Sequence, residues 1–176
     1  SNVTALREAI VDKGIPVLAT SSTCTFTLRD EYPHLLDVDN TGLREHIELA
    51  TRFLWRKLDS GQTLPLGKLP LKVVYHTPCH MEKMGWSIYT LELLRLIPGL
   101  ELTVLDSRCC GIAGTYGFKR ENYPTSQAIG APLFRQIEES GADIVVTDCE
   151  TCKWQIEMST SKRCEHPITL LAKALA

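Results

Sequence analysis

Five cysteines, grouped in three places, constrain the fold of this chain more than any other feature of its sequence. The set is Cys79, the triplet Cys109-Cys110-Gly111, and the C-x-x-C pair Cys149 and Cys152. Two adjacent thiols followed by glycine serve almost no ordinary packing purpose. The pattern therefore favours a fold that brings three distant segments to one place.

Each of the three cysteine groups follows a short apolar segment that is typical of a buried strand. The predicted strands cover 72–76, 101–105 and 143–147. Helices are predicted at 86–97, at 126–140 with Gly141 as its C-cap, from Cys149 onward and at 167–175. Alternating strands and helices predict an α/β fold with a mainly parallel sheet of about four strands. Because the carboxyl ends of parallel strands share one edge, we expect the five cysteines to converge there.

The first seventy residues contain a second set of predicted elements. The pattern indicates a helix at 4–13, a buried strand at 15–19, and a helix at 25–32 that ends before Pro33. A longer helix is expected after the N-cap residues of 37–41, and its apolar face consists of Leu43, Ile47, Ala50, Leu54 and Leu58. Residues 62–70, which include two prolines and a glycine, form a predicted loop.

The N-terminal segment resembles the last cysteine segment when it is shifted by 128 positions. Residues 17–26 then align with 145–154, and Ser21 stands at the position of Cys149. Since this copy lacks one thiol, we expect no second complete cysteine site. The pseudo-symmetry would allow Cys24 to lie near the main site, but we expect it to be a lone buried thiol.

The repeat suggests a domain organisation. We interpret residues 1–38 as the closing portion of a first, incomplete copy, 39–70 as a helix and linker, and 71–176 as the complete copy. On this interpretation the chain is the C-terminal part of a longer protein.

Composition and motifs exclude several classes of function. The formal net charge is −2 and the pI is about 6.2, so there is no global basic field to hold nucleic acid. The most apolar stretch, 88–105, is interrupted by charged residues and by Pro98-Gly99, so it is too broken for the roughly 20 apolar residues of a membrane-spanning helix. The sequence has neither G-x-G-x-x-G nor a P-loop, and we expect no catalytic activity from this chain by itself.

The cysteine pattern is typical of a metal centre in a reducing cytosol. Thiolates are the natural ligands of iron–sulfur clusters and of zinc. A structural zinc takes four ligands, so five cysteines favour a polynuclear cluster. A zinc-stabilised docking module without redox activity, and a thiol–disulfide enzyme that uses Cys149 and Cys152, remain as alternatives.

Three other residues are candidates for the same site. Gly111 lacks the Cβ that would keep the backbone from approaching an inorganic group closely. His76 and His80 flank Cys79, where they would either donate hydrogen bonds to the bound group or be satisfied by backbone carbonyls.

Together, three motifs resemble those of a known family. They are His76-Thr77-Pro78-Cys79-His80, Cys109-Cys110-Gly111 and Asp148-Cys149-Glu150-Thr151-Cys152. They are similar to the cysteine-rich CCG domain of heterodisulfide reductases and of related electron-transfer proteins. These relatives include the iron–sulfur subunits of glycolate oxidases, lactate utilisation proteins and anaerobic glycerol-3-phosphate dehydrogenases, of which the last are most similar. The complete motif covers residues 72–154.

The resemblance implies both a cofactor and a role. The cofactor is a [4Fe–4S] cluster, of cubane or non-cubane geometry, with Cys79, Cys109, Cys110, Cys149 and Cys152 as metal ligands. The implied role is transfer of electrons from flavin-containing catalytic subunits, which oxidise glycerol 3-phosphate, to membrane quinone in anaerobic respiration. The implied location is peripheral, on the cytoplasmic face of the bacterial inner membrane.

Overall fold

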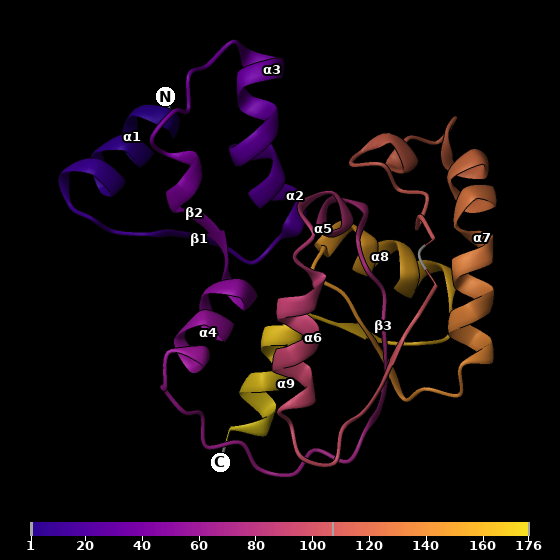
Figure 1. Cartoon of the computed structure of the whole chain (residues 1–176). Helices are drawn as coiled ribbons and strands as arrows, with labels where there is room; N and C mark the ends of the chain where they lie inside the picture. Colours follow the sequence, from indigo (N-terminus) through magenta and orange to yellow (C-terminus); the bar gives the residue numbers. More distant parts are fainter. Residues whose placement is uncertain (1, 107, 176) are drawn as a thin grey trace. The chain divides into compact units, whose positions relative to one another are not determined.

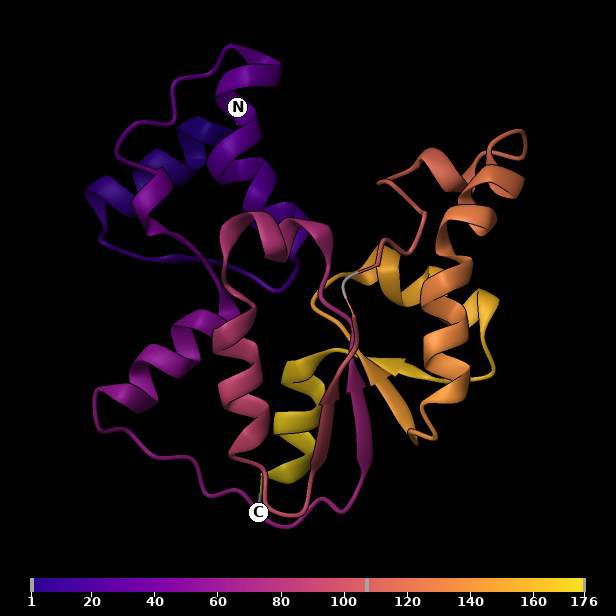
Figure 2. The ribbon, with the colours of Figure 1, turned by 45° about the vertical axis from the view of Figure 1, so that its right-hand side comes forward.

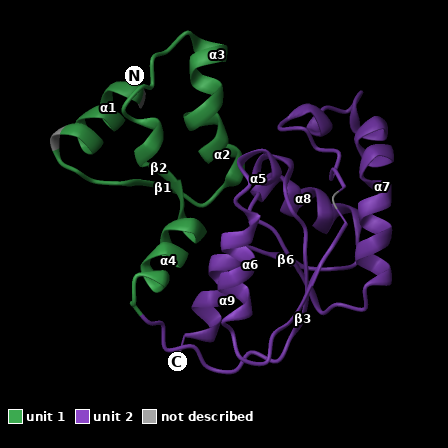
Figure 3. Cartoon of the chain, in the orientation of Figure 1, with its two compact units in different colours: residues 1–62 green, residues 63–176 purple. Residues whose placement is uncertain are grey.

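The computed structural model describes residues 2–106 and 108–175. The described chain divides into two compact units, Ser1–Gln62 and Thr63–Ala176, which are coloured separately in Figure 3. Figure 1 labels the helices and strands of both units. Within the described residues, no helix has the length and apolar content needed to cross a membrane.

The C-terminal unit is built on a parallel sheet. Among the described residues its four strands lie in the order β4, β3, β5 and β6, at Glu101–Val104, Lys72–Tyr75, Ile144–Val146 and Cys164–Glu165. β3 pairs in parallel with β4 and with β5, and β5 pairs in parallel with β6. The prediction of an α/β fold with a parallel sheet of about four strands is confirmed.

Helices cover both faces of this sheet. α6 and α9 pack together on one face, and α7 and α8 lie on the other (Figure 2). Their bounds are Ser87–Arg95 for α6, Pro167–Ala174 for α9, Tyr123–Glu139 for α7 and Glu150–Ser159 for α8. Two short helices complete the unit, α5 at Cys79–Met84 and the 3-10 helix η4 at Tyr116–Phe118. Coverage on both faces explains why β3 and β5 are almost continuously apolar.

The predicted elements of this unit agree closely with the structure. The three predicted strands correspond to β3, β4 and β5, each shorter by one or two residues. β6 is not predicted, because a strand of two residues is too short to show a period.

The N-terminal unit contains short helices around a pair of parallel strands. Its helical segments are α1 at Asn2–Arg7, η1 at Glu8–Asp12, α2 at Ser22–Phe26, η2 at Thr27–Glu31, α3 at Tyr32–Leu36, η3 at Arg44–His46 and α4 at Ala50–Asp59. β1 at Val17–Ala19 pairs with β2 at Ile47–Leu49. The helix predicted at 4–13 is confirmed by α1 and η1.

The prediction that a helix ends before Pro33 is wrong. Pro33 lies in the first turn of α3, and the helical segment continues to Leu36. Proline is tolerated there because a first-turn N–H has no intrahelical partner to lose. The helix ends instead at Asp37, which adopts a left-handed conformation with φ 50°.

The long helix predicted from Leu43 to Leu58 is wrong in its first half. Residues Ile47–Leu49 form β2, all three are buried, and they pair with β1. Pairing with β1 therefore outweighs the helical spacing of the apolar residues in this segment, and a helix forms only in the second half, as α4. The buried Glu48 forms ion pairs with Arg52 and Arg56 of α4, at 3.2 and 3.1 Å.

The prediction that the strand at 15–19 is buried is also wrong. Ile15 is 53% exposed and Leu18, in the middle of β1, is 42% exposed. Within its own unit, β1 pairs with β2 among the described residues, so one apolar face of this short strand has little to cover it.

The two units share an order of elements. In the first unit β1 is followed by helices, by the parallel β2 and by α4, and in the second β5 is followed by α8, by the parallel β6 and by α9. Ser21 is the N-cap residue of α2, as Cys149 is of α8. The positions aligned by the shift of 128 thus have the same place in both units.

Candidate metal centre

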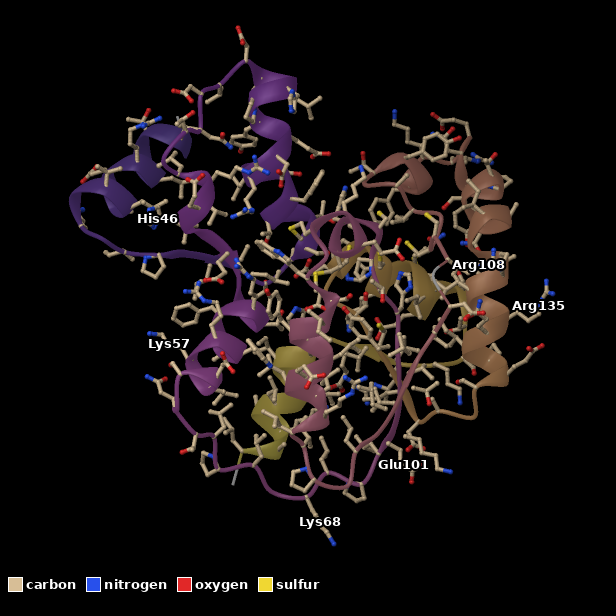
Figure 4. All side chains as sticks on the ribbon, viewed as in Figure 1. His46, Lys57, Lys68, Glu101, Arg108 and Arg135 are labelled. Atoms are coloured by element: carbon tan, nitrogen blue, oxygen red, sulfur yellow. The ribbon has the colours of Figure 1, made fainter. Side chains whose placement is uncertain are left out.

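The three cysteine segments meet at the carboxyl edge of the four-stranded sheet. Cys79 begins α5 after β3, and Cys149 is the N-cap of α8 after β5. In Figure 4, Glu101 at the start of β4 and Arg108, next to Cys109, are labelled at opposite ends of the sheet. A parallel sheet with these crossovers places all three segments on one edge.

The buried part of the site consists of Cys110, Cys152 and His76. The two sulfur atoms are 3.3 Å apart. The possible ligand atoms of all three side chains lie within 4.8 Å of one another, and each residue is at most 5% exposed. His76 is held by its backbone N–H, which donates to the Val146 carbonyl at 2.9 Å. These three side chains therefore form a compact group that could hold a metal.

Among the thiols, Cys110 is the one that the site favours as a thiolate. Hydrogen bonds with Cys109 and Cys152 outweigh the effect of burial and, with His76, hold the pKa of Cys110 far below its usual range. The pKa of Cys109 is raised by its hydrogen bond to Cys110, and that of Cys152 is raised by hydrogen bonds with Cys110 and Cys149. Without a metal, loss of a proton from one thiol makes loss of a proton from the neighbouring thiols less favourable.

The remaining cysteines lie around this buried group. Cys79 and Cys109 are exposed, whereas Cys149 is buried. Burial raises the pKa of Cys79, and the charges of Cys110 and Cys149 raise it further. Since each of the five thiols acts electrostatically on others of the set, the fold brings the five predicted cysteines together.

Gly111 has a packing role in the structure. A Cβ at this position would lie 2.0 Å from the backbone oxygen of Ser126 in α7, and the residue has φ 87°. Gly130, in α7, is restricted by the space around it, because its Cβ would lie 2.5 Å from the Cys110 carbonyl oxygen. Glycine at both positions lets the loop that contains Cys110 lie directly on α7. Closeness to an inorganic group at Gly111 stays a prediction.

Other candidates lie elsewhere. His80 is partly buried in α5, and its backbone N–H lowers the pKa of Cys79. Cys24 is exposed, so the prediction that it is a lone buried thiol is wrong; it lies on α2, which contacts β1. Cys164, by contrast, lies in the core, where burial raises its pKa to about 12.

Sequence reasoning missed a buried hydrogen-bond network beside the cysteines. Asp148, which is fully buried, accepts from the Tyr75 hydroxyl at 2.6 Å and from the Thr90 hydroxyl at 3.1 Å. The signal in the sequence is an aspartate directly after an apolar strand and before Cys149. Because carboxylates are rarely buried without hydrogen-bond partners, that position predicts donors that only the fold can identify.

Thr147 offers a test of the packing under the site. Its side chain is buried, and its hydroxyl has no hydrogen-bond partner among the described residues. Valine has the same shape without the unsatisfied group, so Thr147→Val should raise the free energy of unfolding by about 1 kcal/mol. Chemical denaturation monitored by circular dichroism measures this change. A loss of stability would show that the hydroxyl has a partner.

The residues at this edge fit a metal group. Five thiols provide soft ligands, and the buried His76 Nε2 has no hydrogen-bond partner among the described residues. An orphaned buried ring nitrogen is costly unless something bonds to it. A metal ion, or the sulfur of a cluster, would satisfy it.

The fold and the site define a cysteine-rich domain of the metal-binding kind. Residues 73–157 match the family model CCG, described as "Cysteine-rich domain", and this chain contains a domain of that family. Over all 176 residues it is 85% identical to a protein of Escherichia coli (strain K12) that is named as a subunit of anaerobic glycerol-3-phosphate dehydrogenase. The chain spans 44% of the length of that relative.

More distant relatives share the same region. Lactate utilization protein A of Geobacillus thermodenitrificans is 34% identical over 146 residues, which cover 76% of this chain and 58% of that protein. An uncharacterized iron–sulfur protein of Methanocaldococcus jannaschii is 33% identical over 96 residues, which cover 53% of this chain and 19% of that protein. The chain is thus similar to proteins named for dehydrogenation and for iron–sulfur chemistry.

Proposed function

We propose that this chain is an electron-transfer module that holds an iron–sulfur cluster. The observation that supports it most is the convergence of five cysteines at one edge of the sheet, two of them grouped with the buried His76, whose Nε2 has no hydrogen-bond partner among the described residues. Five thiols exceed the four ligands of a closed zinc site. The similarity to a dehydrogenase subunit and to an iron–sulfur protein agrees with this function.

In this proposal the cluster is of the [4Fe–4S] type. Cys79, Cys109, Cys110, Cys149 and Cys152 would hold it, and when bound it supplies a one-electron redox couple. The chain's own residues contribute in other ways. His76 and His80 would donate hydrogen bonds to it, Gly111 lets the loop pack, and the burial of Cys110 keeps water from that side of the site.

The similarity to a subunit of a dehydrogenase supports partner subunits for this chain. We propose that electrons come from flavin-containing catalytic subunits that oxidise glycerol 3-phosphate and pass toward membrane quinone, with this chain peripheral on the cytoplasmic face of the inner membrane. The name of the Escherichia coli relative supports the substrate. The chain would itself perform no catalysis.

We also propose that residues 1–38 are the closing portion of a first CCG copy and that 71–176 form the complete one, joined by 39–70. The shared element order and the equivalent N-cap positions of Ser21 and Cys149 support this organisation. Since Ser21 has no thiol, the first copy would hold no cluster of its own.

The test is the metal and acid-labile sulfide content of protein purified or reconstituted without oxygen. About four irons and four sulfides per chain, with visible absorbance, are expected. Bleaching of that absorbance on addition of glycerol 3-phosphate and the catalytic subunits would test the proposed donor. Iron without sulfide, or no metal at all after reconstitution, would contradict the proposal.

A zinc-stabilised docking module is the second candidate. The observation that favours it is the compact group of His76, Cys110 and Cys152, because one histidine and two or three thiolates are common ligands of a single zinc ion. One zinc and no sulfide, persisting after anaerobic reconstitution with iron, would establish this function instead.

A further inference from the structure

A buried carboxylate lies directly beside the cysteines. Asp148 occupies the turn between β5 and α8, and both of its oxygens accept hydrogen bonds. The Tyr75 hydroxyl donates to Oδ2 at 2.6 Å, and the Thr90 hydroxyl donates to Oδ1 at 3.1 Å. All three side chains are fully buried. Acceptance at both oxygens is the pattern of a carboxylate ion rather than of a neutral amide.

This network joins the elements that present the ligands. Tyr75 is the last residue of β3 and precedes His76, Thr90 lies in α6, and Asp148 precedes Cys149. The Asp148 carboxylate therefore links β3 and α6, through hydrogen bonds, to the segment that begins α8. Loss of these hydrogen bonds would weaken the link between the N-terminal end of α8 and β3.

The charge in the network is located at Asp148. Burial and then the Asp148 charge raise the pKa of Tyr75 well above its usual value, so Tyr75 remains a neutral donor. The charge of Cys152 also raises the pKa of Tyr75, so the network lies within electrostatic reach of the cysteine site. In such a buried environment a fixed charge is weakly screened.

We propose that Asp148, held by Tyr75 and Thr90, is a positioning residue for the metal centre. It fixes the first turn of α8 so that Cys149 and Cys152 face Cys110, and it supplies a fixed negative charge that lowers the reduction potential of the bound group. The second part rests on the proposed electron-transfer function, whereas the first part holds for any metal.

The positioning is tested on metal-free protein by the rate of thiol alkylation at each cysteine, measured by mass spectrometry. Asp148→Asn keeps the shape but points an N–H₂ group at one of the two hydroxyls. It should speed alkylation of Cys149 and Cys152 about tenfold, since the loss of one charged hydrogen bond makes local opening that much easier. Cys164 should react as slowly as in the wild type, because it lies in the core and its pKa is about 12.

Two further variants make the result specific. Tyr75→Phe removes a single hydroxyl and should accelerate the same two cysteines. Thr147→Val changes the neighbouring residue, whose hydroxyl lies outside the network, and should leave both rates unchanged. If Asp148→Asn also speeds alkylation of Cys164, that variant has unfolded. The test of the positioning role then depends on the alkylation rates in Tyr75→Phe. Wild-type rates at Cys149 and Cys152 in Tyr75→Phe would overturn the positioning role.

The charge is tested by redox titration of the loaded protein. Asp148→Asn should raise the midpoint potential, so that at a fixed ambient potential the ratio of reduced to oxidised centres rises on the order of tenfold. Thr147→Val should not shift it. An unchanged midpoint in Asp148→Asn would overturn the electrostatic part. Absence of iron and sulfide from the wild type would instead contradict the proposed function and leave the alkylation result standing.

Discussion

Cys110→Ser should abolish the visible absorbance and the bound sulfide of the reconstituted protein. Cys110 is the centre of the thiol group, because its sulfur is 3.3 Å from that of Cys152 and its pKa is lowered by Cys109, Cys152 and His76. A serine hydroxyl is a harder and much less acidic ligand, and it would not replace a thiolate. Iron and sulfide analysis and the visible spectrum measure the loss.

Cys24→Ser is the matched control for this experiment. It makes the same chemical change at an exposed cysteine of the N-terminal unit and should retain the full iron and sulfide content. If Cys110→Ser kept its cluster, Cys110 would not be a ligand. If instead no cluster ever formed in the wild type and Cys110→Ser left an active Cys149–Cys152 dithiol, a thiol–disulfide enzyme would be the better interpretation.

The convergence of the cysteines could be predicted from the sequence because it depends on topology alone. Apolar runs at 72–76, 101–105 and 143–147 indicate buried parallel strands, and residues after such strands share one edge. No side-chain detail is needed for that step. The order of strands and helices is therefore enough to bring Cys79, the Cys109–Cys110 pair and Cys149 to one edge.

What could not be predicted depends on contacts between distant residues. Ile47–Leu49 has the apolar spacing of a helix and becomes a strand only because β1 lies beside it. Gly111 has a left-handed φ of 87°, and a Cβ at this position would lie closest to Ser126 of α7, which is distant in sequence. Asp148 likewise has donors from β3 and α6, which no local pattern specifies.

Gly130→Ala should destabilise the protein and loosen its metal centre, which is the opposite of what helix propensity predicts. In a helix interior, glycine to alanine normally stabilises by about 1 kcal/mol. Here the new Cβ would lie 2.5 Å from the Cys110 carbonyl oxygen and 2.3 Å from Cζ of Phe134. Overpacking of this kind lowers the free energy of unfolding by about 1–3 kcal/mol, so the variant should have a lower melting temperature. Differential scanning calorimetry measures it.

The double variant with Phe134→Leu identifies which of the two contacts matters. A smaller side chain at 134 relieves the conflict with the ring, whereas the Cys110 carbonyl belongs to the backbone and cannot move without its thiol. We therefore expect Gly130→Ala with Phe134→Leu to remain poorer in iron than Phe134→Leu alone. Full recovery of iron in the double variant would show that the ring, and not the loop of Cys110, requires the glycine. Persistent loss would show that the packing of α7 against this loop determines where Cys110 lies and hence whether the five thiols can act together.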